Sequence, residues 1–264
     1  MTRTSENSTH NAPRGPPSSW RALLTQAVRT PGLVHQAYSR FHRFSLHNQL
    51  LAWAQCVDRG VTPGPLATFK QWLAIGRCVQ RGQKALTLCV PITIPAKTAE
   101  NGEEKPSRTC FVYRSRWFAL SQTEGAEYEH VGTPDWYEPR ALAQLGITLV
   151  PFESLDGNTQ GYALSGRRIA VSELAALPHK TTFHEIAHVL LRHHEDDKTP
   201  RALKEAMAEA VALLCVEALD LPGSDYARGY VQHWLKGSEF SEEDSQRIIQ
   251  AAQEILVAGA QDVG

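Results

Sequence analysis

The first half of the chain spaces its apolar residues as amphipathic helices do. The segments 18–28 (SSWRALLTQAV) and 35–57 (HQAYSRFHRFSLHNQLLAWAQCV) both return an apolar side chain every three or four positions, the period of one helix face. A shorter helix is predicted over TFKQWLAIG, because Thr68 and Gln71 form a capping box and Gly76 stands where a helix would end. Helices therefore open the chain.

Alternation with period two predicts strands after these helices. The stretches 85–94 (ALTLCVPITI) and 110–120 (CFVYRSRWFAL) are rich in β-branched and aromatic residues, and the polar, turn-rich segment 95–109 joins them. The second half adds two further candidate strands, ITLVPF and RRIAVS. The pattern so far mixes both element types.

Three helices then dominate the second half. The first is expected over 178–193. The second begins with Thr199 as N-cap, followed by proline at the first helical position, and runs to about Leu219. The last begins at Ser241, where SEED is a capping-box pattern. The predicted fold class is therefore α+β: a small α+β domain followed by a mostly helical one.

Composition limits the protein class without changing this picture. With 264 residues, 42% hydrophobic and 21% charged, the chain has the composition of a soluble globular protein of one large or two small domains. No apolar run approaches the roughly 20 residues that span a bilayer, so no membrane partner is expected. The polar, Pro/Ser-rich start predicts a disordered tail over 1–17, not a secretory signal. Five widely spaced cysteines without a C-x-x-C pair are typical of reduced thiols in a cytoplasmic protein.

The charge divides sharply along the chain. Residues 1–120 hold 16 Lys and Arg against five Asp and Glu, whereas 121–264 hold 11 against 23. Such asymmetry indicates two functional units, with the basic one facing a polyanion. Mere drift of surface charge is the alternative. The predicted organisation is a tail (1–17), a basic domain (18–120), a connector (121–145) and a second domain (146–264).

The stretch TTFHEIAHVLLRHHE carries the clearest chemistry. On a helix His184 and His188 project from the same face and can hold one ion, and Glu185 lies beside them. Zinc lowers the pKa of its water towards about 7, and a neighbouring carboxylate can take the proton, as in peptide hydrolysis. At this composition the H-E-x-x-H pattern arises by accident about 0.03 times per chain. The alternative is that Thr182 and Glu185 merely cap a helix start.

A catalytic zinc needs a third protein ligand. His194 has the metzincin spacing, but position 191 is leucine where that arrangement needs a turning glycine, so His194 is not expected to bind. On the next helix Glu205 and Glu209 head an apolar stripe, and buried carboxylates need a cation nearby. We predict Glu205 as ligand and Glu209 as the carboxylate that orients a histidine. In the alternative, Glu205 pairs with Arg201 on a solvated face.

Beyond the tail, the sequence resembles the ArdC-type antirestriction proteins of plasmids and other mobile elements over roughly residues 20–258. The segments YSRFHRFSLHNQLLAWAQ, TFKQWLAIGRCVQRGQKA and FALSQTEG carry the resemblance in the first half, and FHEIAH and KEAMAEAVALLC carry it in the second. Lys204 stands where the family has glutamate, and the pair Glu205-x-x-Ala208 is also similar to ImmA/IrrE peptidases. The family's motif residues stand here as Ser45, Asn48, Leu50, Leu51, Trp72, Gly76, Val79, Gly82 and Lys84.

The resemblance implies a single-stranded DNA-binding domain joined to a zincin-like metallopeptidase domain. Clustered Lys and Arg side chains neutralise phosphates without reading sequence. Unpaired bases stack on aromatic faces, so any exposed members of Tyr38, Phe41, Phe44, Phe69 and Trp72 would favour single strands. The predicted DNA contacts are Tyr38, Arg43, Asn48, Lys70, Trp72, Arg77, Arg81 and Lys84.

The expected function is protection of incoming single-stranded DNA from host restriction, with Zn²⁺ as cofactor and a host or self protein as the substrate of any peptidase activity. His184, His188 and Glu205 are the predicted ligands and Glu185 the predicted catalytic base. One alternative is an ImmA/IrrE-like regulatory peptidase, and another is a non-enzymatic DNA-binding protein with a structural zinc. Three residues remain unassigned candidates for stabilising the oxyanion: Tyr226, Tyr230 and His233.

Overall fold

The protein is described from a computed structural model. It covers residues 18–98, 104–129, 132–154, 156, 158–235 and 237–261. The tail predicted for residues 1–17 lies outside the described residues.

Three helices open the described chain: α1 (Trp20–Arg29), α2 (Leu33–Phe41) and α3 (Leu46–Arg59). The single helix expected over most of α2 and α3 was wrong, because the chain leaves the helical path between them. There the Ser45 side chain accepts a hydrogen bond from the backbone N–H of Asn48 and starts α3 afresh.

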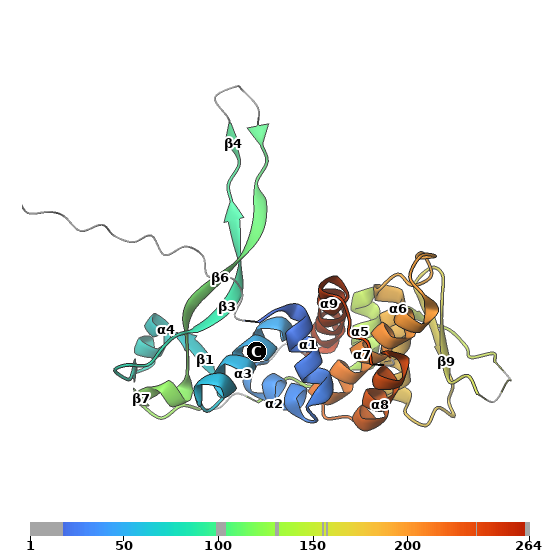
Figure 1. The fold of residues 1–264 in the computed structure, drawn as a ribbon, viewed down its shortest axis with the longest axis horizontal. Helices are drawn as coiled ribbons and strands as arrows, with labels where there is room; N and C mark the ends of the chain where they lie inside the picture. The colour runs from blue at the N-terminus through green and yellow to red at the C-terminus, as the bar shows by residue number, and fades with distance from the viewer. Residues whose placement is uncertain are drawn as a thin grey trace, which may run out of the picture.

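The strands β3 (Leu86–Ile94) and β6 (Arg108–Ala119) pair in antiparallel register and form a long ribbon that projects away from the helices (Figure 1). β1 (Leu66–Thr68) pairs with the other edge of β6. The capping box of Thr68 is confirmed. The remaining elements of this half are α4 (Phe69–Ala74), β2 (Arg77–Val79), β4 (Lys97–Thr98), β5 (Glu104–Lys105), η1 (Leu120–Gln122) and β7 (Thr123–Gly125).

Two side-chain amides of α3 cover the free edge of β3. Asn48 exchanges two hydrogen bonds of 2.8 Å with the peptide N–H and C=O of Cys89. One strand repeat earlier, Gln55 does the same with Thr87 at 2.8 and 2.9 Å. An unpaired strand edge is a site for unwanted pairing, and here α3 satisfies it while anchoring the ribbon to the helices.

The second half has a small sheet and a set of helices. The sheet has the order β8-β10-β9, which leaves β9 at an edge beside α6. β9 and α8 were not expected from the sequence. The elements are α5 (Glu138–Leu145), β8 (Thr148–Leu149), β9 (Gly161–Leu164), β10 (Arg168–Val171), α6 (Pro178–Leu190), α7 (Arg201–Ala218), α8 (Ser224–Leu235) and α9 (Glu242–Gly259).

Two helix ends differ from expectation and one agrees. α6 ends at Leu190 instead of position 193, because Arg192 adopts the left-handed conformation (φ 56°) and turns the chain. The N-cap of α7 is Pro200, without a side-chain hydrogen bond, so the predicted Thr199 cap was wrong. Ser241 caps α9 by accepting from the N–H of Asp244, as predicted. The fold class is α+β.

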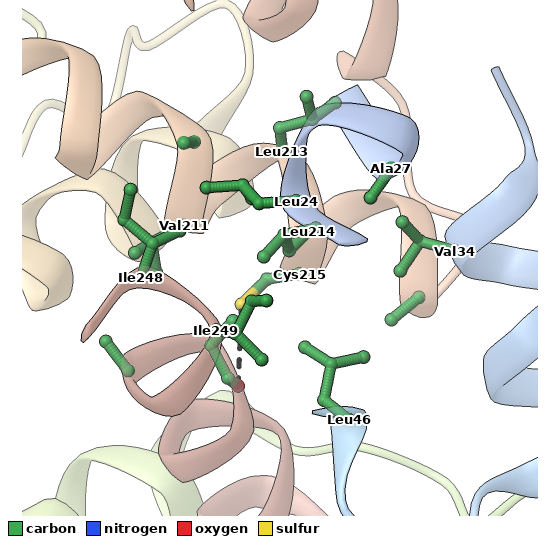
Figure 2. Close-up of a cluster of buried hydrophobic side chains, with 14 of the residues drawn as sticks. Leu24, Ala27, Val34, Leu46, Val211, Leu213, Leu214, Cys215, Ile248 and Ile249 are labelled. Carbon is green, nitrogen blue, oxygen red and sulfur yellow. Dashed lines mark hydrogen bonds between the residues drawn. The ribbon is translucent and has the colours of Figure 1, made fainter. Parts of the chain in front are cut away.

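One hydrophobic core joins the two halves of the chain. Helix α7 is buried on all sides along most of its length, and α1–α3 pack against it and against α9. The division at residue 120 therefore stays a prediction, and in space the first helices complete the core of the second half. Figure 2 shows this junction with Leu24, Ala27, Val34 and Leu46 against Val211, Leu213, Leu214, Cys215, Ile248 and Ile249.

Two further facts bear on environment. All five cysteines lie within the described residues and none is in a disulfide. Among the described residues, no helix combines the length and apolarity that crossing a bilayer requires.

Candidate functional site

The structure brings His184 and His188 of α6 next to Glu205 of α7. The two histidine Nε2 atoms lie 3.1 Å apart, and Glu205 Oε2 lies 3.4 Å from the first and 3.7 Å from the second. One possible ligand atom from each of the three residues lies within 4.8 Å of the other two. Two imidazoles and a carboxylate are the donor set of a His₂Glu zinc site, so the residues present fit a divalent metal.

Glu209 lies behind this group, one turn further along α7. Its Oε2 is 2.9 Å from Nδ1 of His184 and its Oε1 is 2.6 Å from Nζ of Lys180. Burial alone would raise the pKa of Glu209, but His184 and Lys180 outweigh it and lower that pKa. An ionised carboxylate on the outer nitrogen of a ligand histidine orients its ring.

The charges of the site depend on one another. Hydrogen bonds from His184 and His188 hold the pKa of Glu205 well below its usual range. Burial by itself lowers the pKa of His184, but hydrogen bonds with Glu205 and Glu209 outweigh it and raise that pKa to about 9. A metal would therefore have to displace a proton from His184 at neutral pH.

Glu185 lies on the buried side of α6, facing β9. Burial raises its pKa to about 7, and the backbone N–H of Ala163 on β9 donates a hydrogen bond to it. β9 approaches so closely that a Cβ on Gly161 would lie 2.7 Å from Thr181 and 3.1 Å from Glu185. A carboxyl group that titrates near neutrality is suited to take and return a proton.

An open cavity of about 800 Å³ lies over these residues. Helix α8 contributes Tyr226 and Tyr230 to its wall, and Nζ of Lys180 lies 5.1 and 5.9 Å from the centres of their rings. Both tyrosines are solvent-exposed. Of the three oxyanion candidates, these two line the cavity, whereas His233 does not.

The predicted DNA contacts separate into buried and exposed groups. Tyr38 and Trp72 are only 6% and 1% exposed, and Trp72 Nε1 donates to the carbonyl of Phe118. The side-chain amide of Asn48 is hydrogen-bonded to the backbone of Cys89. Side chains so enclosed cannot stack on a base or bind a phosphate without unpacking the core, so these three predicted contacts are corrected to structural roles.

Arg77 is also engaged within the fold. Its guanidinium donates to the hydroxyl and carbonyl of Thr123 and to the carbonyl of Ala126, which ties β2 to the segment around β7. The other predicted cations, Arg43, Lys70, Arg81 and Lys84, are exposed.

The surface around α4 and the ribbon carries further exposed groups. Phe69 is 48% exposed and Phe111, on β6, is 71% exposed. No Asp or Glu stands between Asp58 and Glu100 in the sequence. Arg108, Arg114 and Arg116 on β6 are exposed as well. These side chains place positive charge and apolar rings on the same part of the molecule.

Residues 19–118 match the family model described as the N-terminal domain of anti-restriction factor ArdC. The first half of the chain is therefore similar to the N-terminal domain of ArdC. No curated protein sequence matches it.

The ArdC fold extends over most of the chain. The metal-free crystal structure of the antirestriction ArdC protein from plasmid R388 is 21% identical and superposes with a TM-score of 0.54, covering 90% of this chain and 94% of that one. The Mn(II)-bound structure of the same protein is 19% identical, with a TM-score of 0.51 and the same coverage.

The structure contradicts two alternatives that the sequence left open. Thr182 lies inside α6, which begins at Pro178, so it does not cap the helix and the capping alternative was wrong. The ion pair of Arg201 with Glu205 does exist at 3.8 Å, but Arg201 is 89% exposed and Glu205 also contacts both histidines. The pair therefore does not place Glu205 on a solvated face.

Sequence reasoning weighed His194 and missed its neighbour. His194 is exposed, whereas His193 is buried with Nδ1 only 2.8 Å from Nδ1 of His188. Burial lowers the pKa of His193 to about 3. The turn at Arg192 produces this contact, and no helical spacing in the sequence could have indicated it.

Proposed function

We propose that this ArdC-type chain is an antirestriction-type protein that coats incoming single-stranded DNA in the cytoplasm and carries a zinc-binding peptidase-like site. The observation that carries the proposal is the pairing, in one ArdC-type fold, of an exposed basic surface around α4 and β6 with the cluster of His184, His188 and Glu205.

The DNA-binding part rests on exposed groups of the first half. Lys70, Arg81 and Lys84 form no ion pair with any described residue, so their charge is available to phosphates. Each phosphate neutralised releases a counterion, which makes binding strong at low salt and independent of base sequence. Phe69 and Phe111 offer exposed rings, and bases can reach such rings only when they are unpaired. The combination favours single strands over duplex.

The metal part rests on the donor set. One solved structure of R388 ArdC is Mn(II)-bound, which supports a divalent ion in this chain as well. Two imidazole nitrogens favour zinc over the harder, oxygen-seeking ions, so we propose Zn²⁺ on His184, His188 and Glu205. When bound, zinc would supply a polarised water. The protein's own part is Glu209 orienting His184 and Glu185 holding or moving a proton.

A second candidate function has its own supporting observation. The buried, raised-pKa carboxyl of Glu185 faces a cavity beside the edge strand β9, an arrangement suited to peptide hydrolysis. A regulatory peptidase acting on a host or self protein is therefore the alternative. If Glu185→Gln removes a cleavage activity and leaves DNA binding intact, the two functions are separable; if it changes nothing, zinc serves the fold alone.

The first experiment is fluorescence anisotropy of the full-length chain with a labelled oligonucleotide, single-stranded and duplex, across a salt series. The full chain is used because the halves share a core. We expect preference for the single strand, and a log K against log salt slope that falls by about 0.7 for each contact removed in Arg81→Ala and Lys84→Ala. Equal binding to duplex, or no dependence on salt, would refute coating of single strands.

Phe69→Ala tests stacking in the same assay. It should cost about 1–3 kcal/mol of binding free energy, while Phe69→Tyr should retain most of it. Leu174→Ala is the matched control, because Leu174 is an apolar side chain 93% exposed in the other half of the molecule. An equal loss of binding free energy in Leu174→Ala would mean that the loss in Phe69→Ala does not come from stacking on Phe69.

A further inference from the structure

We infer that His193 is a positioning residue that accepts the Nδ1 hydrogen of His188 when His188 binds a metal, and so holds the orientation of the His188 ring. The inference rests on the metal site of the proposed function and deepens it. It begins with the direction in which each ring nitrogen points: Nε2 of His188 faces His184 and Glu205, while its Nδ1 points the opposite way and lies 2.8 Å from Nδ1 of His193.

Two ring nitrogens at this distance share one hydrogen, so one donates and the other accepts. A histidine that binds a metal through Nε2 carries its hydrogen on Nδ1. His188 in that form donates to His193, whose Nδ1 must then be bare and whose hydrogen must sit on Nε2. The reverse arrangement puts the hydrogen of His188 on Nε2, where the metal would bind. The tautomer of His193 thus decides whether His188 can be a ligand.

The surroundings of His193 hold its ring in place. The side chain is buried, and its backbone N–H donates to the carbonyl of His188 at 3.0 Å. Its own carbonyl accepts from Nζ of Lys204 at 2.8 Å, and Lys204 also donates to the carbonyl of Asp196. Together with the left-handed turn at Arg192, these bonds return the chain to the end of α6.

The two ligand histidines therefore have unlike outer partners. Nδ1 of His184 meets the Glu209 carboxylate at 2.9 Å, and an ionised carboxylate can only accept. Nδ1 of His188 meets a neutral ring that can either accept or donate. Nε2 of His193 is buried and forms no hydrogen bond with any described residue, so nothing else in the described part of the molecule selects its tautomer. The demand of His188 for an acceptor is what selects it.

The test measures Zn(II) affinity of the full-length chain by competition with a chromophoric chelator, and the absorption spectrum of the Co(II) form. His193→Leu removes the acceptor and should weaken Zn(II) binding about 10–100-fold and change the Co(II) spectrum. His193→Asn places an amide oxygen near the position of Nδ1 and should stay within about threefold of wild type. His194→Leu, the same change at the exposed neighbour, should have no effect.

The outcomes separate this inference from the function beneath it. Wild-type protein that binds neither Zn(II) nor Co(II) overturns the metal site and the inference together. Wild-type binding that His193→Leu leaves unchanged, with an unaltered Co(II) spectrum, overturns the inference alone. Should His193→Leu not fold, the ¹⁵N shifts of wild-type His188 in the Zn(II) form decide: hydrogen on Nδ1 is expected, and hydrogen absent from Nδ1 refutes the proposal.

Discussion

Helix α7 carries buried carboxylates near both of its ends, and the two groups behave differently. Near the start, Glu205 and Glu209 meet histidines beside an open cavity. Near the end, Glu217 pairs with Arg228 of α8 in a closed interior. Both sites are charged and largely enclosed, yet only the first leaves room for a ligand.

Both carboxylate oxygens of Glu217 and both terminal nitrogens of Arg228 form hydrogen bonds within the protein. Glu217 also accepts from the backbone N–H groups of Gly32 and Val34 at 3.2 and 3.3 Å, at the start of α2. Arg228 donates to the carbonyl groups that end α1, at Ala27 and Val28. The pair therefore satisfies the free ends of two helices from the first half and joins them to the second.

The carboxylate pKa values differ in the same sense. Burial raises the pKa of Glu217 in spite of Arg228, whereas contacts with His184 lower those of Glu205 and Glu209. In the closed pair, Arg228 only partly offsets the effect of burial on the pKa of Glu217. In the open group, Glu205 and Glu209 stay ionised because His184 beside them is protonated. A metal cation can replace that positive charge. The closed pair thus uses its charged atoms to join helices, whereas the open group lies where a ligand can reach it.

Breaking the closed pair should have the largest effect. Arg228→Met leaves Glu217 without its counter-ion in a dry interior and removes the hydrogen bonds at the end of α1, so we expect about 3–5 kcal/mol less free energy of unfolding in urea. Arg201→Met is the matched control, because it breaks the ion pair of Arg201 with Glu205, another glutamate of α7. Arg201 is 89% exposed, so the loss of unfolding free energy should stay below about 1 kcal/mol. Similar losses in both variants would contradict the comparison.

Removing a ligand from the open group should affect metal binding more than folding. Glu205→Gln takes away the carboxylate and should lower Zn(II) affinity more than about a hundredfold, beyond the range for outer partners. Unfolding of the metal-free chain should change little, because Glu205 is only half-buried and its histidines keep other partners. Calorimetric titration measures the first and urea the second. Glu254→Gln, on the exposed face of α9, is the control.

The smallest effect expected is in the pH dependence of two quantities. The stability of the metal-free protein should fall as pH rises, whereas its affinity for zinc should rise. The pKa of folded His184, about 9, exceeds its ordinary value of 6.5, so its contribution to metal-free stability is complete below pH 6.5 and is lost as pH rises through 9. Zinc must displace that proton, so its affinity should rise about tenfold per pH unit over the same window and level off above it. If stability and zinc affinity changed with pH in the same direction, His184 would not be protonated in the metal-free protein.

Much of the candidate site could be predicted from helical spacing. His184 and His188 share a helix face by arithmetic alone, and Glu205 was identified because a carboxylate at the head of an apolar stripe needs a cation. The capping box at Thr68 and the N-cap at Ser241 were equally local and are confirmed. Local rules succeed here because one turn of helix contains all the interacting atoms.

The first half of the chain shows where such rules stop. Phe69 and Trp72 lie three positions apart on α4, and both are aromatic; the first is 48% exposed and the second 1%. Residues three positions apart lie on the same side of a helix, so periodicity gave no sign that one of them would be covered and the other exposed. Asn48 resembles a polar contact residue in sequence, whereas its partner Cys89 lies on a strand 41 positions away.

Composition and spacing within single elements were enough to predict the charge division, the helix that presents the histidine pair and the residues of the candidate metal site. Tertiary structure alone decided that the two halves share a core, that β9 lies against Glu185, and that His193, not His194, contacts His188. Those three depend on where separate segments meet, and a left-handed turn at one arginine was enough to exchange the roles of neighbouring histidines.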